Sequence, residues 1–458
     1  MDLVLREFNR FSVAMHVTHS QPPREFVPGQ SPVQVSGRVY GSAEVESLSA
    51  ATLDFWLTTG RFDDEFCELF QEFLGLKHAL TANSGSSANL LAVTALTSHL
   101  LGDKRLIPGD EVITVAAGFP TTINPILQNN LVPVFVDVDI PTYNIDPQRI
   151  EAAIGERTKA IFVAHTLGNP FNLDTVTRLA EKHGLWVIED CCDALGAEYD
   201  LPEDRSLVGG HTLTAGRAKC GSFGHISAFS FYPAHHITMG EGGAVATNDN
   251  TLRRALLSYR DWGRDCWCPP GHDDTCKRRF TLQFGELPMG YDHKYVYSHV
   301  GYNLKITDMQ AAVGVAQMRR LPEFVDARAK NYAYLRERLT QAGDVLTLPE
   351  ATPGSTPSWF GMPLKLNPNA GFSREELLVH LNDKKIGTRL LFGGNLLRQP
   401  YMKGQNYRVA GTMENTDAVM RDVFWIGVYP GLTEAHLDYT CQTMLDFIRT
   451  RSKRPAVL

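Results

Sequence analysis

The 458-residue sequence has no long hydrophobic run and no excess of positive charge. No segment reaches the ~20 apolar residues that a transmembrane helix needs, so we expect no membrane partner. The 44 Lys and Arg residues are outnumbered by 51 Asp and Glu, which disfavours a nucleic-acid binder, because such proteins are more often basic. The first residues also lack the apolar core of a signal peptide. These absences predict a cytoplasmic protein.

Cysteine is scarce, with eight residues, and a reducing cytoplasm disfavours a disulfide framework. One tight cluster, Cys266-x-Cys268-x7-Cys276, therefore indicates metal binding or catalysis. Cys67 and Cys441 stand alone within helical patterns, and we interpret both as packing residues. Hydrophobic residues make up 43% of the chain, which excludes a disordered or fibrous protein.

From about residue 60, short apolar runs alternate with helical patterns. This alternation predicts an α/β fold whose mostly parallel sheet is covered by helices on both faces. The expected strands are 79–83, 110–116, 132–138, 160–165, 185–190, 225–231 and 243–247. The expected helices are 86–100, 120–129, 147–154, 174–183, 250–260, 307–320, 322–341, 373–383 and 433–450.

We predict three parts of the chain. Residues 1–45 are an extended lead-in, rich in Pro, Gln, Ser and Gly in its second half. Residues 46–325 form a large cofactor-binding domain, and residues 326–458 form a smaller C-terminal α/β domain. Residues 200–222 interrupt the strand–helix rhythm with Gly, Pro and charged residues, and we expect a loop or β-hairpin insertion there.

Two segments end expected strands with polar residues. The segment 83–89 (NSGSSAN) opens a helix, where free backbone N–H groups and the hydroxyls of Ser86 and Ser87 can bind a phosphate. An ordinary helix N-cap explains the same residues equally well. Asp190 ends another apolar strand, where a carboxylate can either hold a pyridinium nitrogen protonated or cap a helix.

The segment 229–243 (FSFYPAHHITMGEGG) is the most specific. It resembles the lysine-bearing motif of the fold-type-I, pyridoxal-phosphate-dependent sugar aminotransferases, and the resemblance covers roughly residues 30–450. In that family a lysine at the position of His235 bonds the cofactor covalently. No lysine lies between Lys219 and Lys277, so no neighbour replaces it. Histidine cannot make that bond, but it can transfer a proton near neutral pH.

The resemblance implies roles for further residues. It places Phe119 on the face of the cofactor ring, Asp190 at the ring nitrogen and Ser230 at the phosphate. Asn303, in a Gly-Tyr-Asn segment, is implied to reach the cofactor phosphate of a neighbouring subunit, so we expect a homodimer. Asp193 stands near the phenolic oxygen of the cofactor, where the aminotransferases usually have glutamine, and its role stays open.

The chain is more similar to one branch of this family, the 3-dehydratases of CDP- or dTDP-linked 4-keto-6-deoxyhexoses. The segments that carry this similarity are 190–196, 230–236, 260–268 and 290–299. In that branch four cysteines bind a 2Fe-2S cluster, and the matching residues here are Cys192, Cys266, Cys268 and Cys276. The insertion lengthens the gap after the first of these ligands, so Cys191 and Cys220 stay open as alternatives to it.

The branch implies a hydro-lyase of deoxysugar biosynthesis that holds pyridoxamine 5′-phosphate (PMP) noncovalently and removes the C3 hydroxyl of the sugar. His235 is implied as the base that takes a proton from the cofactor, with His236 as the rival. Electrons are implied to arrive through the cluster from a separate iron–sulfur flavin reductase or a ferredoxin-type donor. Arg389 and Arg398 are candidates for binding the substrate diphosphate, although both can also be ordinary surface arginines.

Three other functions stay open. An ordinary sugar aminotransferase requires the lysine that the motif lacks. A metal-free PMP-dependent 3-dehydratase, ending in transamination and loss of ammonia, gives the clustered cysteines no function. A non-enzymatic regulatory domain could use the cysteines for structural zinc, but Asp190 and the phosphate loop suit a reacting cofactor.

Overall fold

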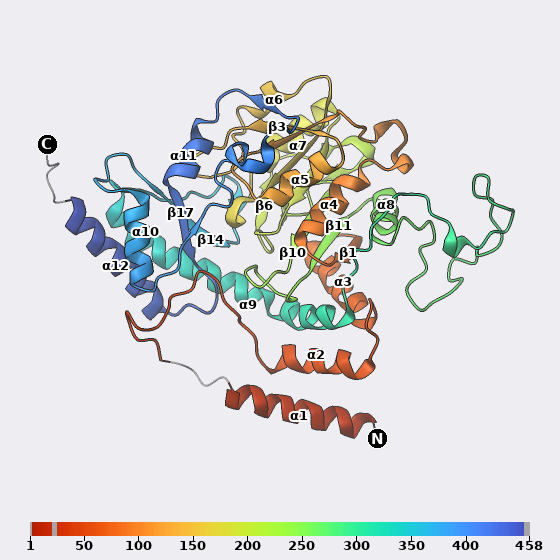
Figure 1. The fold of residues 1–458 in the computed structure, drawn as a ribbon, viewed down its shortest axis with the longest axis horizontal. Coiled ribbons are helices and arrows are strands. Elements are labelled where there is room, and N and C mark those ends of the chain that lie inside the picture. The colour runs from red at the N-terminus through yellow and green to blue at the C-terminus, as the bar shows by residue number, and fades with distance from the viewer. Residues whose placement is uncertain (1, 21–24, 453–458) are drawn as a thin grey trace.

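The computed structural model describes residues 2–20 and 25–452. Its centre is an eight-stranded sheet (Figure 1). In spatial order the strands are β1 (His78–Ala82), β11 (Gly243–Thr247), β10 (Ile226–Ser230), β5 (Trp186–Asp190), β4 (Thr158–Ala164), β2 (Glu111–Val115), β3 (Val132–Val136) and β16 (Arg408–Ala410). Of these eight, β11 alone is antiparallel to its neighbours. The mostly parallel sheet and its seven expected strands are thereby confirmed.

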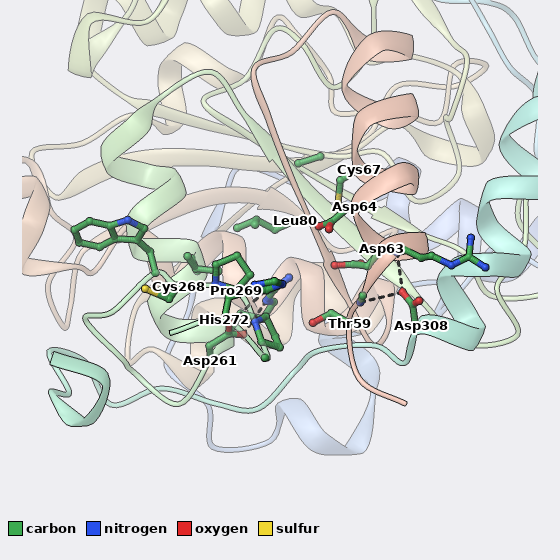
Figure 2. Close-up of a pocket in the computed structure, with 18 of the residues that line it drawn as sticks. Thr59, Asp63, Asp64, Cys67, Leu80, Asp261, Cys268, Pro269, His272 and Asp308 are labelled. Atoms are coloured by element: carbon green, nitrogen blue, oxygen red, sulfur yellow. Dashed lines mark hydrogen bonds and ion pairs between the residues drawn. The ribbon is translucent and has the colours of Figure 1, made fainter. Parts of the chain in front are cut away.

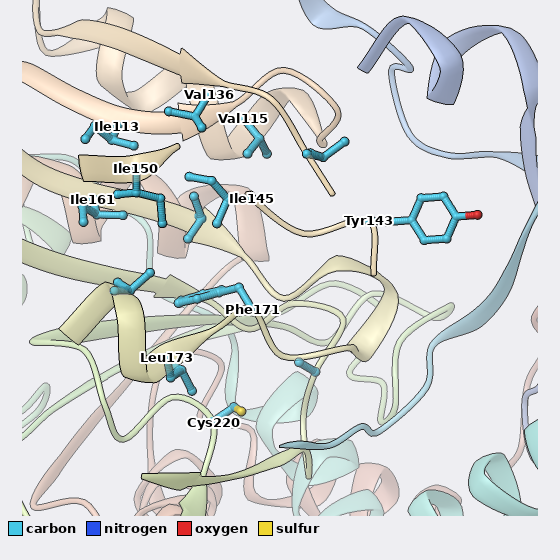
Figure 3. Packing of buried hydrophobic residues seen from close by; sticks show 14 of the residues in the cluster. Ile113, Val115, Val136, Tyr143, Ile145, Ile150, Ile161, Phe171, Leu173 and Cys220 are labelled. Carbon is cyan, nitrogen blue, oxygen red and sulfur yellow. The ribbon is translucent and has the colours of Figure 1, made fainter. Parts of the chain in front are cut away.

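Helices cover both faces of this sheet. Successive side chains of a strand point to opposite faces, so Ile161 and Val163 of β4 enter one apolar cluster while Ala160 and Phe162 enter another. Helix α7 (Leu173–His183) closes the first cluster, part of which Figure 3 shows. Helices α4 (Gly85–Ala95) and α8 (Asn250–Arg260) close the second. The continuous apolar character of the strands follows from this double coverage.

The remaining helices of the N-terminal part are α1 (Asp2–Ser20), α2 (Ser42–Asp54), α3 (Arg61–Leu74), α5 (Pro120–Gln128) and α6 (Ile150–Ala153). Of these, α5 contributes to the second cluster and α6 to the first, whereas α2 and α3 pack against α9 (Asp308–Leu339), and α1 packs against α2. Helix α3 packs against α9 in a third apolar cluster that includes Phe66 and Phe324. This third cluster places α9 along one side of the large sheet.

The insertion at residues 200–222 is a β-hairpin. Strand β6 (Glu198–Leu201) pairs with β9 (Gly216–Lys219) on one side and with β13 (Ser355–Thr356) on the other, and β7 (Arg205–Ser206) pairs with β8 (Thr212–Leu213) nearer the tip. The hairpin therefore joins the N-terminal and C-terminal parts of the chain instead of standing free in solvent.

A second, antiparallel sheet lies in the C-terminal part. It contains β12 (Leu346–Thr347), β14 (Gly361–Leu366), β17 (Val423–Gly427) and β15 (Arg389–Leu390). Helices α9, α10 (Arg374–Asp383) and α12 (Glu434–Ser452) complete its core, and α11 (Glu414–Asp422) lies beside β14 and β17. Cys441 is buried in this core, as expected for a packing residue.

Helix α9 differs from the expectation of two helices, 307–320 and 322–341. It is one helix of 32 residues with Pro322 inside it. A proline removes one backbone hydrogen bond, but packing on both sides can hold a helix together across it. Leu321 and Phe324 are buried beside the large sheet, and Leu335 is buried beside the small one, so α9 is anchored at both ends.

The N-terminal segment also differs from expectation. Residues 2–20 form helix α1 instead of an extended lead-in, and residues 21–24 of that segment lie outside the described residues. The apolar side chains of Val4, Phe8 and Phe11 recur at helical spacing and are exposed. This spacing indicates a helix, but the prediction of an extended segment was based on the Pro-rich stretch that follows. Across residues 2–20 and 25–452, no helix has both the length and the apolar character needed to cross a bilayer.

Candidate active site

Three loops that carry predicted site residues meet at the carboxyl edge of the large sheet. They follow β1, β5 and β10, which run parallel to one another. Ala228 of β10 pairs directly with Asp190 of β5, so the residues after these two strands are neighbours. Ligands of open α/β sheets bind at this edge, because the loops that follow parallel strands converge there.

The loop after β1 forms the N-terminus of α4. Ser84 caps this helix by accepting the Ser87 N–H at 3.1 Å, and the Ser84 and Ser87 hydroxyls lie 3.0 Å apart. Ser86 is exposed at the same turn. Free N–H groups at the start of a helix and adjacent hydroxyls make an anion site, so the cap and the phosphate site coexist in the same residues.

Close packing brings Ser230 to this helix N-terminus. A Cβ added to Gly85 would lie 2.4 Å from Cβ of Ser230, a distance at which two carbon atoms clash. A Cβ added to Gly243 would similarly meet the Ser84 carbonyl oxygen at 2.4 Å. The absence of side chains at these two glycines lets β10 and β11 approach the phosphate loop.

The Asp190 carboxylate at the end of β5 is buried and held in one orientation. Its Oδ2 accepts hydrogen bonds from Asn89 Nδ2 at 2.8 Å and Thr122 Oγ1 at 2.7 Å, and its Oδ1 accepts the Cys192 N–H at 3.1 Å. Asn89 and Thr122 were not among the predicted site residues. Asn89 had a detectable signal, since it lies one turn into the helix that the phosphate loop opens.

His235 lies just beyond β10, beside Asp193. Its Nδ1 is 3.4 Å from Asp193 Oδ1, and within the described residues this buried nitrogen has no hydrogen-bond partner. Arg328 Nη2 donates to the His235 carbonyl oxygen at 3.1 Å, which fixes the backbone. Burial raises the pKa of Asp193, and the neighbouring His235 opposes that rise. The ring is only half-buried, with Asp193 beside Nδ1, so a molecule bound at this edge of the sheet can reach it.

His236 points away from this pair. Its Nε2 lies 2.9 Å from the Ser358 carbonyl oxygen, and the ring is buried. Burial, reinforced by the charge of Arg328, lowers the pKa of His236 well below its ordinary value. His236 is therefore a neutral residue tied to the backbone, and His235 is the better placed of the two as a base.

Phe119 and Asn303 are both exposed near this edge. Phe119 precedes α5, and its ring, 52% exposed, packs edge-on against Phe392 with centroids 6.2 Å apart. Asn303 forms a β-bridge with Asp261, and the next carbonyl, that of Leu304, accepts the Asn83 N–H at 2.8 Å. Because both side chains are exposed, Phe119 can pack on the ring of a bound cofactor, and Asn303 can contact a neighbouring subunit.

The two candidate arginines differ in their surroundings. Arg398 forms a bidentate ion pair with Asp417, at 2.8 and 2.7 Å, which occupies the fork of its guanidinium. Arg389 is exposed and donates to the carbonyl oxygen of Thr388. Of the two, Arg389 is therefore the one available for a diphosphate.

The structure brings together three of the four predicted cysteine ligands. Cys266, Cys268 and Cys276 line one small cavity together with His293. Cys192 does not line it, and its backbone N–H is bound to Asp190 instead. Cys191 and Cys220, the open alternatives, are both buried in the core. Three thiols in one cavity suit a thiophilic metal, whereas Cys192 belongs to the edge of the sheet.

A larger cavity of about 1230 Å³ lies between the cysteine loop and helix α3 (Figure 2). Cys268 and His272 line one side, and Asp63 and Asp64 line the other. Asp308 at its rim accepts the Gly60 and Asp63 N–H groups, so it caps α3. Burial raises the pKa of Asp63 to about 6, with the Arg260 charge opposing.

One buried trio among the described residues has its potential ligand atoms within 4.8 Å of one another: His165, Glu189 and Cys191. Glu189 already accepts the N–H groups of Gly221, Phe223 and Gly224, as well as His165 Nε2 at 3.0 Å. Because these bonds occupy both carboxylate oxygens, the trio is a hydrogen-bonded part of the core.

The parallel sheet, the phosphate loop after β1 and the carboxylate after β5 define a fold-type-I, pyridoxal-phosphate-type sugar aminotransferase fold. The chain belongs to the DegT/DnrJ/EryC1/StrS aminotransferase family, which it matches over residues 40–445. This membership confirms the predicted fold class and the resemblance on which it was based.

Two curated relatives match nearly the whole chain. The lipopolysaccharide biosynthesis protein RfbH of Salmonella typhimurium is 56% identical over 443 residues, which cover 97% of this chain and 98% of that protein. The dTDP-4-dehydro-2,6-dideoxy-D-glucose 3-dehydratase of Saccharopolyspora spinosa is 49% identical over 427 residues, covering 93% and 89% respectively. Both extend across the site and the cysteine loop.

A solved structure of similar fold is the E. coli GDP-4-keto-6-deoxy-D-mannose-3-dehydratase with bound hydrated PLP. It has a TM-score of 0.77 and 26% sequence identity, and the match covers 90% of this chain and 99% of that one. The Asp190 carboxylate, held by Asn89 and Thr122, and the close approach of Gly85 to Ser230 fit a cofactor of the same kind.

Proposed function

We propose that this chain is a cytoplasmic PMP-dependent 3-dehydratase, a hydro-lyase acting on a CDP- or dTDP-linked 4-keto-6-deoxyhexose in deoxysugar biosynthesis. The observation that carries the proposal is His235, a half-buried histidine beside Asp193 at the position of the family's cofactor-bonding lysine. Without that lysine the cofactor cannot be held covalently between turnovers. The name of the relative from Saccharopolyspora spinosa, a dTDP-4-dehydro-2,6-dideoxy-D-glucose 3-dehydratase, supports the substrate class.

Each site residue has one task in this proposal. PMP, when bound, supplies the amine that combines with the C4 ketone and a ring that accepts an electron pair. Ser86, Ser87 and Ser230 bind its phosphate, and Phe119 covers its ring. Asp190, held by two side-chain donors, keeps the ring nitrogen protonated.

His235 moves the proton. Asp193 faces Nδ1, so Nε2 is the atom that we expect to accept a proton, while the Asp193 carboxylate stabilises the charged imidazole. The C3–O bond then breaks, and the hydroxyl leaves as water with the proton that His235 has accepted. Arg389 is placed to bind the diphosphate of the substrate.

We further propose that the reaction is reductive. Replacing the C3 hydroxyl by hydrogen requires two electrons and two protons, and the three-cysteine loop is suited to an iron–sulfur centre that delivers the electrons. The donor would be an iron–sulfur flavin reductase or a ferredoxin-type protein. The exposed Asn303 supports a homodimer, as expected from the family resemblance.

A metal-independent 3-dehydratase that ends in transamination is the second candidate. The observation that favours it is that Cys192 does not line the cavity shared by Cys266, Cys268 and Cys276. The two candidates share His235 and PMP and differ only in whether the protein needs iron for turnover.

The experiment that tests the dehydratase is His235→Asn, assayed anaerobically with CDP- and dTDP-4-keto-6-deoxyglucose. We expect dehydration to fall at least ~100-fold, the usual contribution of a positioned acid–base group. PMP should remain bound, as measured by absorbance and native mass spectrometry. His183→Asn, on the outer surface of α7, is the control. Wild-type turnover in His235→Asn would refute the proposal.

A further inference from the structure

Arg328 lies in the middle of α9, beside the loop that carries His235, and only 2% of the residue is exposed. Burying a guanidinium costs free energy unless its N–H groups find acceptors, so an arginine in this place is expected to bind something definite around it. Burial lowers the pKa of Arg328 to about 10, and the nearby Asp193 carboxylate opposes that change. The side chain is therefore a buried cation at neutral pH, close to the candidate base.

The guanidinium of Arg328 joins two segments that are distant in the sequence. Its Nη2 donates to the His235 carbonyl oxygen at 3.1 Å. Its Nη1 donates to the carbonyl oxygens of Phe360 at 3.1 Å and Trp359 at 3.4 Å. The N–H groups of an arginine point in fixed directions from one plane, which suits it to bridge such acceptors. Because all three acceptors are main-chain atoms, Arg328 fixes the course of the chain at both segments.

Phe360 provides a second link between Arg328 and the imidazole of His235. The rings of His235 and Phe360 lie 5.1 Å apart between centroids, at 31° to each other. The guanidinium carbon of Arg328 is 5.8 Å from the centroid of the same phenylalanine ring. Phe360 is itself buried and packs against Trp425, with centroids 5.3 Å apart. Arg328 therefore holds His235 directly at its carbonyl group and indirectly through the ring on which the imidazole packs.

The segment 358–360, which supplies two of the acceptors, is anchored to the carboxyl edge of the large sheet. The Ser358 N–H donates to the Gly168 carbonyl oxygen at 3.0 Å, and the Ser358 hydroxyl donates to the Leu195 carbonyl oxygen at 2.8 Å. The Ser358 carbonyl oxygen lies 2.9 Å from His236 Nε2. A Cβ added to Gly168 would lie 1.9 Å from that same oxygen, so the two segments are in close contact. Arg328 thus ties the His235 loop to a segment that is itself fixed to the loops after β4 and β5.

We propose that Arg328 is a positioning residue of the dehydration, which orients His235 without touching substrate or cofactor. The inference rests on the proposed function, because its consequence is for the proton transfer at His235 Nε2. The Arg328 guanidinium fixes the main chain of His235, Phe360 supports one face of the imidazole, and Asp193 faces Nδ1. A general base must lie within hydrogen-bond reach of the proton that it accepts, so the position of this ring controls the rate.

The test is a double-mutant cycle of Arg328→Lys and His235→Asn in the full chain. Lysine keeps the positive charge, but its single ammonium group cannot reproduce the planar fork that reaches both segments. Arg374→Lys is the matched control, because Arg374 also donates to two main-chain carbonyls, those of Met420 at 2.8 Å and Val423 at 3.1 Å, in the C-terminal part. Circular dichroism establishes that each variant is folded. Hydrogen exchange of residues 232–237, measured by mass spectrometry, reports on the loop without any need for turnover.

We expect Arg328→Lys to lower kcat by ~10- to 100-fold, the usual effect of a small misplacement of a reacting group, while KM and the PMP affinity stay near wild type. Exchange at residues 232–237 should become faster. Phe360→Leu, which leaves Arg328 in place, should lower kcat by a smaller factor, and Arg374→Lys should not change it. In the His235→Asn background, Arg328→Lys should cause almost no further loss, because the side chain that it positions is gone.

Two results would overturn the role of Arg328. The first is a double variant in which the losses of Arg328→Lys and His235→Asn multiply, since Arg328 would then act independently of His235. The second is wild-type kcat and wild-type hydrogen exchange in Arg328→Lys. The cycle also separates this inference from the proposed function. Multiplied losses remove the role of Arg328 and leave the dehydratase in place, whereas wild-type turnover in His235→Asn refutes both.

Discussion

Gly85 controls how closely the phosphate loop approaches strand β10. A methyl group there would lie 2.4 Å from Cβ of Ser230, so the two elements must separate. We expect Gly85→Ala to lower the free energy of unfolding by about 1–3 kcal/mol, the usual cost of overpacking, and to weaken PMP binding. Thermal unfolding and a PMP titration measure both effects.

Gly155→Ala is the control for this change. A Cβ at Gly155 would meet its nearest neighbour at 3.7 Å, an ordinary contact, and the residue lies far from the phosphate loop. Its stability and PMP affinity should stay near wild type. If Gly85→Ala and Gly155→Ala had the same stability and the same PMP affinity, the close approach at Gly85 would have no role in the site.

His299 makes stability depend on pH. Burial, with a contribution from His99, lowers its pKa from 6.5 to about 4. As the pH falls below 6.5, His299 becomes protonated in the unfolded chain, whereas in the native protein it stays neutral until about pH 4. The free energy of unfolding therefore decreases between pH 6.5 and pH 4. Because the ring is partly exposed, the loss is on the order of 1 kcal/mol.

The variant His299→Gln isolates this effect. Its melting temperature should fall less than that of wild type between pH 7 and pH 5. Asp63, whose raised pKa of about 6 gives an opposite pH dependence, is present in both proteins and cancels in the comparison. If the melting temperatures of the two proteins fell by the same amount between pH 7 and pH 5, the role of His299 in the pH dependence would be contradicted.

Some site residues are visible in the sequence and others are not, for a physical reason. Asp190 and the phosphate loop could be predicted because each directly follows an apolar strand. The partners of Asp190 could not, since Asn89 and Thr122 are separated from it by 101 and 68 residues and meet it only through the sheet.

At the scale of elements, burial decides what can be predicted. Inner strands of the large sheet, such as β2, β3 and β5, are buried on both faces and are detected as continuous apolar runs. Most strands of the hairpin and of the small sheet have only two to four residues, too few for a recognisable period. Their existence depends on pairing with distant segments, such as β13 with β6.

The hairpin at 200–222 shows how an insertion can leave a site intact. Its strands β6 and β9 pair with each other, and β6 also pairs with β13 of the C-terminal part. Cys220, at its base, is buried and donates its N–H to the Ala197 carbonyl. The extra residues therefore add contacts outside the carboxyl edge of the large sheet, and the loop after β5 keeps its place.

At the scale of the whole molecule, we predict a homodimer in which Asn303 contributes to the neighbouring cofactor site. Asn303 is exposed and not held by a side-chain partner among the described residues. Sedimentation velocity should give twice the mass of one chain. Asn303→Ala should weaken PMP binding about tenfold, the value of one charge-assisted hydrogen bond, while the dimer mass is unchanged.

A monomer in solution would contradict this prediction, and so would an unchanged PMP affinity in Asn303→Ala. Ser86→Ala is a useful comparison, because Ser86 belongs to the phosphate loop of the same chain. If both variants weaken PMP binding by similar factors, the phosphate is bound by both residues.

The order of strands in the large sheet has a consequence for synthesis of the chain. Strand β16, from the C-terminal part, covers the outer edge of β3. About 270 residues separate the two strands, so at ~5–20 residues per second that edge stays open for roughly 15 to 55 s during translation. An uncovered strand such as Val132–Val136 can pair with another chain. A nascent chain that stalls before residue 408 is therefore the form most exposed to aggregation.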